Sequence, residues 1–136
     1  MSIINALTVA GAGMSAQNQR LATVVSNLAN VDSVTSSTGA PYKARHVIFA
    51  AVPLRSVSGG VPLESVRVVG VVQSNAPAPL RYEPGNPLAN KEGYVKTSNV
   101  NPIESMVDML SASRAYQDNV TAANLLKSVA VKTLTL

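Results

Sequence analysis

The sequence has no cysteine and no tryptophan, and only one histidine and one phenylalanine among its 136 residues. The absence of cysteine excludes disulfides and thiolate metal sites. His46 lies in a stretch of alternating residues and is expected on the surface of a strand, and no carboxylates cluster near it to complete a zinc site. Paired carboxylates, a P-loop and a Gly-x-Ser-x-Gly elbow are also missing. The sequence therefore predicts no metal ion, no cofactor and no enzymatic activity.

Charge is scarce and unevenly distributed. Charged residues make up 13% of the chain, the net charge is +4, and residues 1–30 carry a single charge, Arg20. Between Lys43 and Lys96 the bases outnumber the acids, but they stand singly, without a run and without interleaved aromatic residues. This pattern favours solvated loop and strand charge. A small basic nucleic-acid-binding module is the alternative that the pI near 9.7 leaves open.

The N-terminal stretch resembles a signal peptide only in part. Residues 3–16 are largely apolar, but no Lys or Arg precedes them, and Asn5 and Thr8 interrupt the run. The stretch is also too short for a transmembrane helix. If the chain leaves the cytoplasm, we expect it to do so without an ordinary cleaved signal peptide.

The last third of the chain contains neither glycine nor proline after Pro102, which favours one long helix over residues 102–136. Asn101 can cap this helix, Pro102 suits its first position, and Glu104 is placed as a capping-box acid. About 30 residues of helix would span roughly 45 Å. Such a helix has few large apolar residues, so it needs a partner.

The first 30 residues can supply that partner, because they follow a heptad pattern. The residues spaced by seven are Leu7, Met14, Leu21 and Leu28. The companion positions are Ile3, Ala10, Gln17 and Val24. Small residues around this seam would let another helix approach closely, although Gly11 and Gly13 each cost about 1 kcal/mol of helix stability. An ordinary buried helix of a globular domain is the alternative.

One stripe of the C-terminal helix can face this seam. Its residues are Ile103, Met106, Met109, Leu110, Ser113, Tyr116, Val120, Ala123, Leu126, Ala130 and Leu134. The two ends of the chain are therefore predicted to pair as a coiled coil. Arg114 and Tyr116 are candidates for packing against another subunit, with simple solvation as the alternative.

The middle of the chain, residues 31–101, has a different character. It contains runs rich in β-branched and aromatic residues at 42–52, 66–73, 80–82 and 93–95, separated by turns rich in Gly and Pro. The sequence thus predicts an α+β fold with a small, irregular β-rich insert that projects from one end of the helix pair. Residues 1–30 and 102–136 would form one split domain.

A Gly-x-Gly-x-x-Ala match at residues 11–16, with Asp32 further along the chain, raises dinucleotide binding as another possibility. The surrounding sequence does not fit, because residues 26–30 make a poor second strand and no further βαβ unit follows. Dinucleotide binding is therefore disfavoured.

Several motifs resemble those of the bacterial flagellar rod, hook and filament-junction proteins. The stretch Ser26-Asn27-Leu28-Ala29-Asn30, after an apolar heptad helix, is similar to the N-terminal signature of that family. Further similarity lies in residues 41–49, 82–95 and 99–119 and in the final five residues, so the resemblance covers most of the chain.

This resemblance implies a structural subunit of the flagellar basal body rather than an enzyme. Members of the family pass through the type III export apparatus and assemble helically into a shaft that crosses the periplasm and transmits motor torque. The implied partners are other copies and other rod proteins, the export apparatus in transit and, indirectly, the membrane ring, with no nucleic acid and no small-molecule substrate. The residues expected to pack between subunits are Leu7, Met14, Leu21, Val24, Asn27, Leu28, Asn30, Met106, Met109, Leu110, Arg114, Tyr116, Val120 and Leu126.

Overall fold

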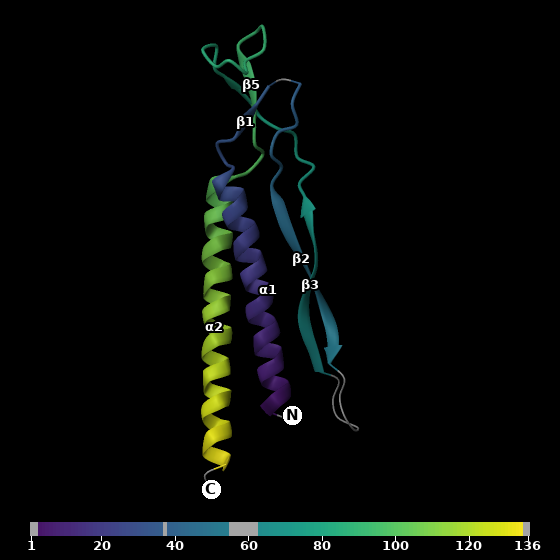
Figure 1. The fold of residues 1–136 in the computed structure, drawn as a ribbon, viewed down its shortest axis with the longest axis vertical. Helices are drawn as coiled ribbons and strands as arrows, with labels where there is room; N and C mark the ends of the chain where they lie inside the picture. The colour runs from purple at the N-terminus through teal and green to yellow at the C-terminus, as the bar shows by residue number, and fades with distance from the viewer. Residues whose placement is uncertain (1–2, 37, 55–62, 135–136) are drawn as a thin grey trace.

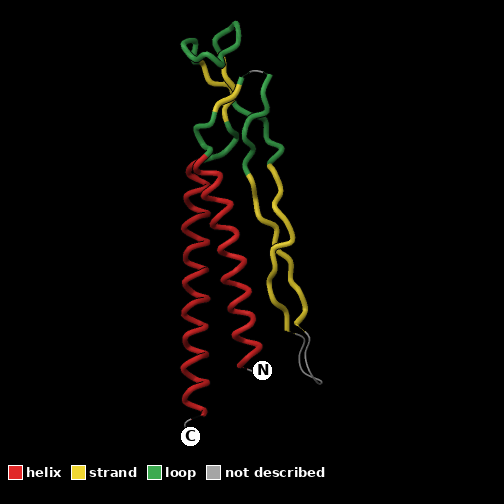
Figure 2. Tube along the Cα trace, in the orientation of Figure 1, coloured by secondary structure: helices red, strands yellow, loops and turns green. Residues whose placement is uncertain are grey.

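The computed structural model describes residues 3–36, 38–54 and 63–134 and has the predicted α+β layout. Two long helices come from the ends of the chain, and the strands lie between them in sequence (Figures 1 and 2). The elements in chain order are α1 (Ile3–Ala29), β1 (Val34–Thr35), β2 (Arg45–Leu54), β3 (Leu63–Gln73), β4 (Leu80–Tyr82), β5 (Tyr94–Thr97) and α2 (Pro102–Leu134).

Helix α2 begins where the sequence predicts. The Oδ1 atom of Asn101 accepts hydrogen bonds from the backbone N–H groups of Ile103, at 3.0 Å, and Glu104, at 3.4 Å. These contacts satisfy N–H groups that the first turn of a helix leaves unpaired. Pro102 occupies the first helical position, where its missing N–H has no consequence.

The two helices lie side by side and antiparallel along most of their length (Figure 1). An ion pair between Arg20 of α1 and Asp108 of α2 fixes their relative register. Further along, Gly13 of α1 faces Asn119 of α2. The pairing of the two ends of the chain is thus present, while the finer prediction of coiled-coil packing stays a prediction.

The buried residues of both helices are small. Those of α1 are Ala10, Gly13, Ala16, Val24 and Asn27, and those of α2 are Ser105 and Ala112. A Cβ atom on Gly13 would lie 2.7 Å from the Oδ1 atom of Asn119, so no larger side chain fits there without a shift. The closest contacts between the helices therefore depend on small side chains. Of the heptad residues spaced by seven, Leu7 is exposed, and Met14, Leu21 and Leu28 are half-buried.

Strands β2 and β3 form an antiparallel two-stranded hairpin, paired from Arg45 opposite Gln73 to Leu54 opposite Leu63, with a bulge near Ile48. The hairpin runs alongside α1, on the side away from α2 (Figure 1). For this part of the insert, the prediction that it projects from one end is wrong.

The small residues of α1 explain why the hairpin packs along the helix. Ala12 and Ala16 face Val66 and Val68 of β3 across a shallow groove. Because alanine side chains are short, α1 can accept close neighbours on two sides, with α2 on one and the hairpin on the other. Strand β2 continues to Leu54, two residues beyond the predicted run at 42–52. Residues 55–62 lie outside the described part of the chain.

A second sheet, with strand order β1-β5-β4, lies at the end of the helix pair where α1 finishes and α2 begins (Figure 1). All its pairings are antiparallel, and the Val95 side chain is fully buried. Gly93 precedes β5 with a φ angle of +83°, and a Cβ atom there would lie 2.7 Å from the Tyr82 ring. Both constraints favour glycine. Strand β1 falls in a Ser/Thr-rich stretch, outside the strand runs that the sequence predicted.

Candidate functional site

Asn27, in the last turns of α1, holds the start of the hairpin against the helix. Its Nδ2 atom donates to the carbonyl oxygen of Arg45 at 2.7 Å, and its Oδ1 atom accepts from the Arg45 N–H at 2.9 Å. The same oxygen accepts from the Tyr42 hydroxyl at 3.1 Å. The side chain is only 4% exposed and contacts Arg45 as a neighbouring strand would, through one donor and one acceptor.

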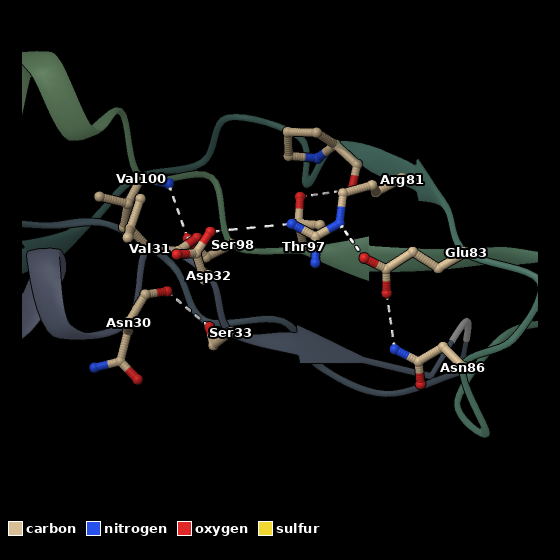
Figure 3. Close-up of polar contacts among 11 residues, drawn as sticks. Asn30, Val31, Asp32, Ser33, Arg81, Glu83, Asn86, Thr97, Ser98 and Val100 are labelled. Carbon is tan, nitrogen blue, oxygen red and sulfur yellow. Dashed lines mark hydrogen bonds and ion pairs between the residues drawn. The ribbon is translucent and has the colours of Figure 1, made fainter.

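Asn30 closes α1 three residues later. Its backbone N–H donates to the carbonyl oxygen of Asn27 at 3.0 Å, and its Nδ2 atom donates to that of Ser26 at 2.8 Å. These bonds satisfy carbonyl groups that the end of a helix leaves unpaired. Ser33 then donates from its hydroxyl to the Asn30 carbonyl oxygen at 2.8 Å (Figure 3). The motif at residues 26–30 therefore ends the helix and also attaches the hairpin.

Ser98 and Asn99 join the returning chain to the same region. The Ser98 hydroxyl donates to the carbonyl oxygen of Val31 at 3.1 Å, just beyond the end of α1 (Figure 3). The Oδ1 atom of Asn99 accepts from the Ala44 N–H at 2.7 Å, and its Nδ2 atom donates to the Ala76 carbonyl oxygen at 2.8 Å. We call Asn27, Asn30, Ser98 and Asn99 the junction, because their contacts join the end of α1, the start of the hairpin and the segment that leads from β5 to α2.

The turn between β4 and β5 has its own polar contacts. The Nε atom of Arg81 lies 2.7 Å from a carboxylate oxygen of Glu83, and Asn86 donates to the other oxygen of Glu83 at 2.8 Å (Figure 3). The rings of Tyr82 and Tyr94 meet edge to face, with centroids 5.3 Å apart. Residues 82–87, with the sequence Tyr-Glu-Pro-Gly-Asn-Pro, lie here within the segment 82–95 that resembles the flagellar family, and these contacts hold them in place.

The predicted packing residues occupy three environments. Val24 and Asn27 are buried. The half-buried residues are Met14, Leu21, Leu28, Asn30, Met109, Val120 and Leu126. The exposed residues are Leu7, Met106, Leu110, Arg114 and Tyr116. The exposed set includes large apolar side chains on α2, and a single chain leaves these side chains open to contact with another.

Sequence reasoning pointed to small residues on α1, Gly13 among them, but did not single out their counterparts on α2. Ser105 and Ala112 are the buried residues of α2, although neither belongs to the predicted packing set. A signal was present, because Ser105 and Ala112 are spaced by seven and Asn119 and Leu126 continue the series. Small and polar residues at heptad spacing mark a close contact between helices less visibly than leucines do.

The described structure does not support a dinucleotide-binding site, a metal site or a membrane-spanning helix. Residues 11–16 lie in the middle of α1, so the Gly-x-Gly-x-x-Ala match lacks the strand-to-helix turn that dinucleotide binding requires. Among the described residues, no group of three or more His, Asp or Glu side chains is arranged to hold a metal ion. Within the same residues, neither long helix combines the length and the hydropathy needed to cross a membrane.

Comparisons with known proteins identify the family. A family model described as "Flagella basal body rod protein" matches residues 7–35, and one described as "Flagellar basal body rod FlgEFG protein C-terminal" matches residues 91–129. The flagellar basal-body rod protein FlgC of Escherichia coli O157:H7 is 47% identical over all of this chain and 98% of its own length.

Relatives with lower sequence identity have the same name. The protein of the same name from Salmonella typhimurium is 46% identical over all of this chain and 98% of its own length. That of Borreliella burgdorferi is 35% identical over 95% of this chain and 93% of its own. The matched segments contain most of α1 with its closing motif and most of α2. The chain therefore belongs to the FlgC family of flagellar basal-body rod proteins.

Proposed function

We propose that this chain, a structural subunit of the flagellar basal-body rod, packs helically among other copies of itself and other rod proteins. The observation that carries the proposal is an apolar surface on α2 that faces away from α1. Ile103, Met106 and Leu110 are 73%, 52% and 53% exposed. We call these three residues the outer patch. Burying such side chains stabilises contacts by about 1.5–3 kcal/mol each when burial is complete.

Residues 1–30 and 102–136 would supply the core of a proximal-rod shaft, with α1 and α2 pairing as a coiled coil, and residues 31–101 would face adjacent subunits. Small residues between the helices support this assignment, because they allow dense packing of many helices. Dense packing provides the stiffness that a torque-bearing shaft in the periplasm needs. A catalytic role has no part in the proposal.

The proposal includes passage through the type III export apparatus in an unfolded state. Glycines within α1 and exposed apolar side chains on α2 support it, because such helices are marginal in isolation. Docking at the growing end of the rod would then order them. Contact with the membrane ring would be indirect, through other rod proteins.

No observation favours the nucleic-acid alternative. The basic residues of the insert remain dispersed, and Arg81 is engaged with Glu83. The relatives reported above are all named as rod proteins.

The proposal is tested by Leu21→Asp, which places a charge on a half-buried position of α1. We expect the variant to be exported but absent from purified basal bodies, and the cells to be non-motile, because the charge would be desolvated between packed helices. Asn18→Asp, one turn earlier at an exposed position, is the matched control and should incorporate normally. Normal motility of the Leu21→Asp strain would count against the packing of these helices in the rod.

A further inference from the structure

The β2–β3 hairpin is attached to the helices by polar contacts at its base and by shallow apolar contacts along its length. Ala12 and Ala16 of α1 lie against it across a shallow groove. Within the described residues, the hydrogen bonds that join a strand of the hairpin to a helix are those of Asn27 with Arg45, and no ion pair does so. The direction in which the hairpin leaves the helix pair is therefore decided mainly at its base.

Asn99 contacts both legs of the hairpin, which are the segments just before β2 and just after β3. Neither leg has regular secondary structure. The Oδ1 atom of Asn99 accepts from the Ala44 N–H of the first leg at 2.7 Å, and its Nδ2 atom donates to the Ala76 carbonyl oxygen of the second at 2.8 Å. The legs are also joined directly, because the Ser74 N–H donates to the Ala44 carbonyl oxygen at 2.7 Å. One amide side chain thus holds both legs, through one donor and one acceptor.

Asn99 is fixed to the start of α2, whereas Asn27 belongs to α1. Two residues after Asn99, the side chain of Asn101 caps the first turn of α2, and Val100 between them is buried. The base of the hairpin is therefore held from both helices, at two consecutive residues. A second attachment removes rotations that a single attachment would allow, as supporting contacts do around any precisely placed group.

We propose that Asn99 is a positioning residue, which acts through the backbone of Ala44 and Ala76 to set the angle between the hairpin and the helix pair. Strand β2 has 10 residues, so the hairpin is an arm roughly 33 Å long. A rotation of about 10° at its base would move its far end by roughly 6 Å, which would separate that end from α1. A regular assembly needs the same shape in every copy, so a fixed angle serves the proposed packing, although the angle itself is a property of one chain.

The distance between two spin labels in the full chain tests this role, because the chain has no cysteine of its own. One label is attached at Glu64→Cys, toward the far end of the hairpin, and the other at Ala122→Cys on α2, and both positions are exposed. Double electron–electron resonance should give a single narrow distance in the chain that carries only the labels. In Asn99→Ala, we expect the most populated distance to shift by several ångströms and the distribution to widen, while the helical circular dichroism signal is retained.

Asn90→Ala is the matched control. The Oδ1 atom of Asn90 also holds backbone groups, because it accepts from the N–H groups of Glu92 and Tyr94, but it does so in the turn between β4 and β5. The label distance should not change in this variant. Asn99→Asp is a second test, since it keeps the acceptor and loses the donor to Ala76. We expect a wider distribution in Asn99→Asp as well, and this variant decides if Asn99→Ala does not fold.

An unchanged distance in both Asn99 variants, or an equal shift in Asn90→Ala, would overturn the inference. Loss of the helical signal in both Asn99 variants would also overturn it, because Asn99 would then support the helix pair as a whole. A broad distance in the chain that carries only the labels would do the same, because the hairpin would not be held at one angle. The proposed function is tested separately, by the presence of the unaltered chain in purified basal bodies.

Discussion

Helices α1 and α2 are antiparallel neighbours, yet contacts within the chain bury them to very different extents. Helix α1 lies between α2 and the β2–β3 hairpin and buries five residues. Helix α2 has α1 on one side, and although it is longer it buries only Ser105 and Ala112. The difference teaches that α1 is covered by contacts within the chain, whereas α2 has apolar side chains that no contact within the chain covers.

Composition explains the contrast. Arg20 is the only charged residue of α1, and the residues it buries are mostly small, so two neighbours can pack against it at short distances. Helix α2 carries acids and bases along its length together with exposed apolar residues such as Leu110 and Leu125. Mixed polar and apolar surface of this kind is typical of contacts that form on assembly.

The largest effect on this comparison is expected from Ala112→Leu. Ala112 is 0% exposed, so the added carbons would push α1 and α2 apart. We expect the free energy of unfolding of the isolated chain to fall by about 3 kcal/mol, at the upper end for overpacking. Urea denaturation followed by circular dichroism measures this loss. Ala122→Leu, at an exposed position of the same helix, is the control. If the two variants lost equal amounts of unfolding free energy, α1 and α2 would not be in close contact at Ala112.

A somewhat smaller effect is expected from Asn27→Leu, which keeps the shape of the side chain but removes its polar atoms. The backbone groups of Arg45 and the Tyr42 hydroxyl would lose their partner, at a cost of about 2 kcal/mol. Hydrogen exchange should show faster exchange at the start of β2 and little change in α2. Asn124→Leu, exposed on α2, should be close to neutral, and unchanged exchange in β2 of Asn27→Leu would show that the junction does not hold the hairpin.

Gln17 is an exception to the favourable packing of α1 within the chain. Its Oε1 atom is buried and has no hydrogen-bond partner within the described chain. Gln17→Leu should therefore stabilise the isolated chain by about 1 kcal/mol, through removal of an unpaired buried acceptor. An increase in the urea midpoint is the expected result. A decrease would indicate that the amide makes a contact that supports α1.

The smallest effect is expected from Met106→Ser, in the outer patch of α2. Because Met106 is half exposed and contacts little within the chain, the free energy of unfolding should change by less than about 0.5 kcal/mol. The same variant should reduce incorporation into basal bodies. A large loss of stability in the isolated chain would place Met106 in the core of a single subunit and break the distinction between the helices.

The two long helices could be predicted from the sequence to a large extent. Local signals act there, since Asn101, Pro102 and Glu104 define the start of α2 and Asn30 closes α1. Strand β4 was likewise predicted with its observed bounds, because β-branched and aromatic runs bounded by turn residues are also local.

The position of the hairpin and the residues at the helix contact could not be predicted in the same way. Alternating residues identify a strand but do not say which surface it covers, so the packing of the hairpin on α1 depends on tertiary contacts with residues such as Ala12 and Ala16. The sequence pointed to small residues such as Gly13 as places of close approach on α1, but it did not say that Asn119 of α2 would face Gly13, because that pairing depends on the register of the two helices.

The central claim is that α2 exposes a surface that only a neighbouring subunit covers, and Leu110→Asp tests it most directly. The measurement is the amount of this variant in purified basal bodies, set against the urea midpoint of the isolated chain. We predict a midpoint equal to that of the unaltered chain, normal export, and no variant in basal bodies, because the charge would be buried only on assembly. Incorporation at the normal level with normal swimming would contradict the account.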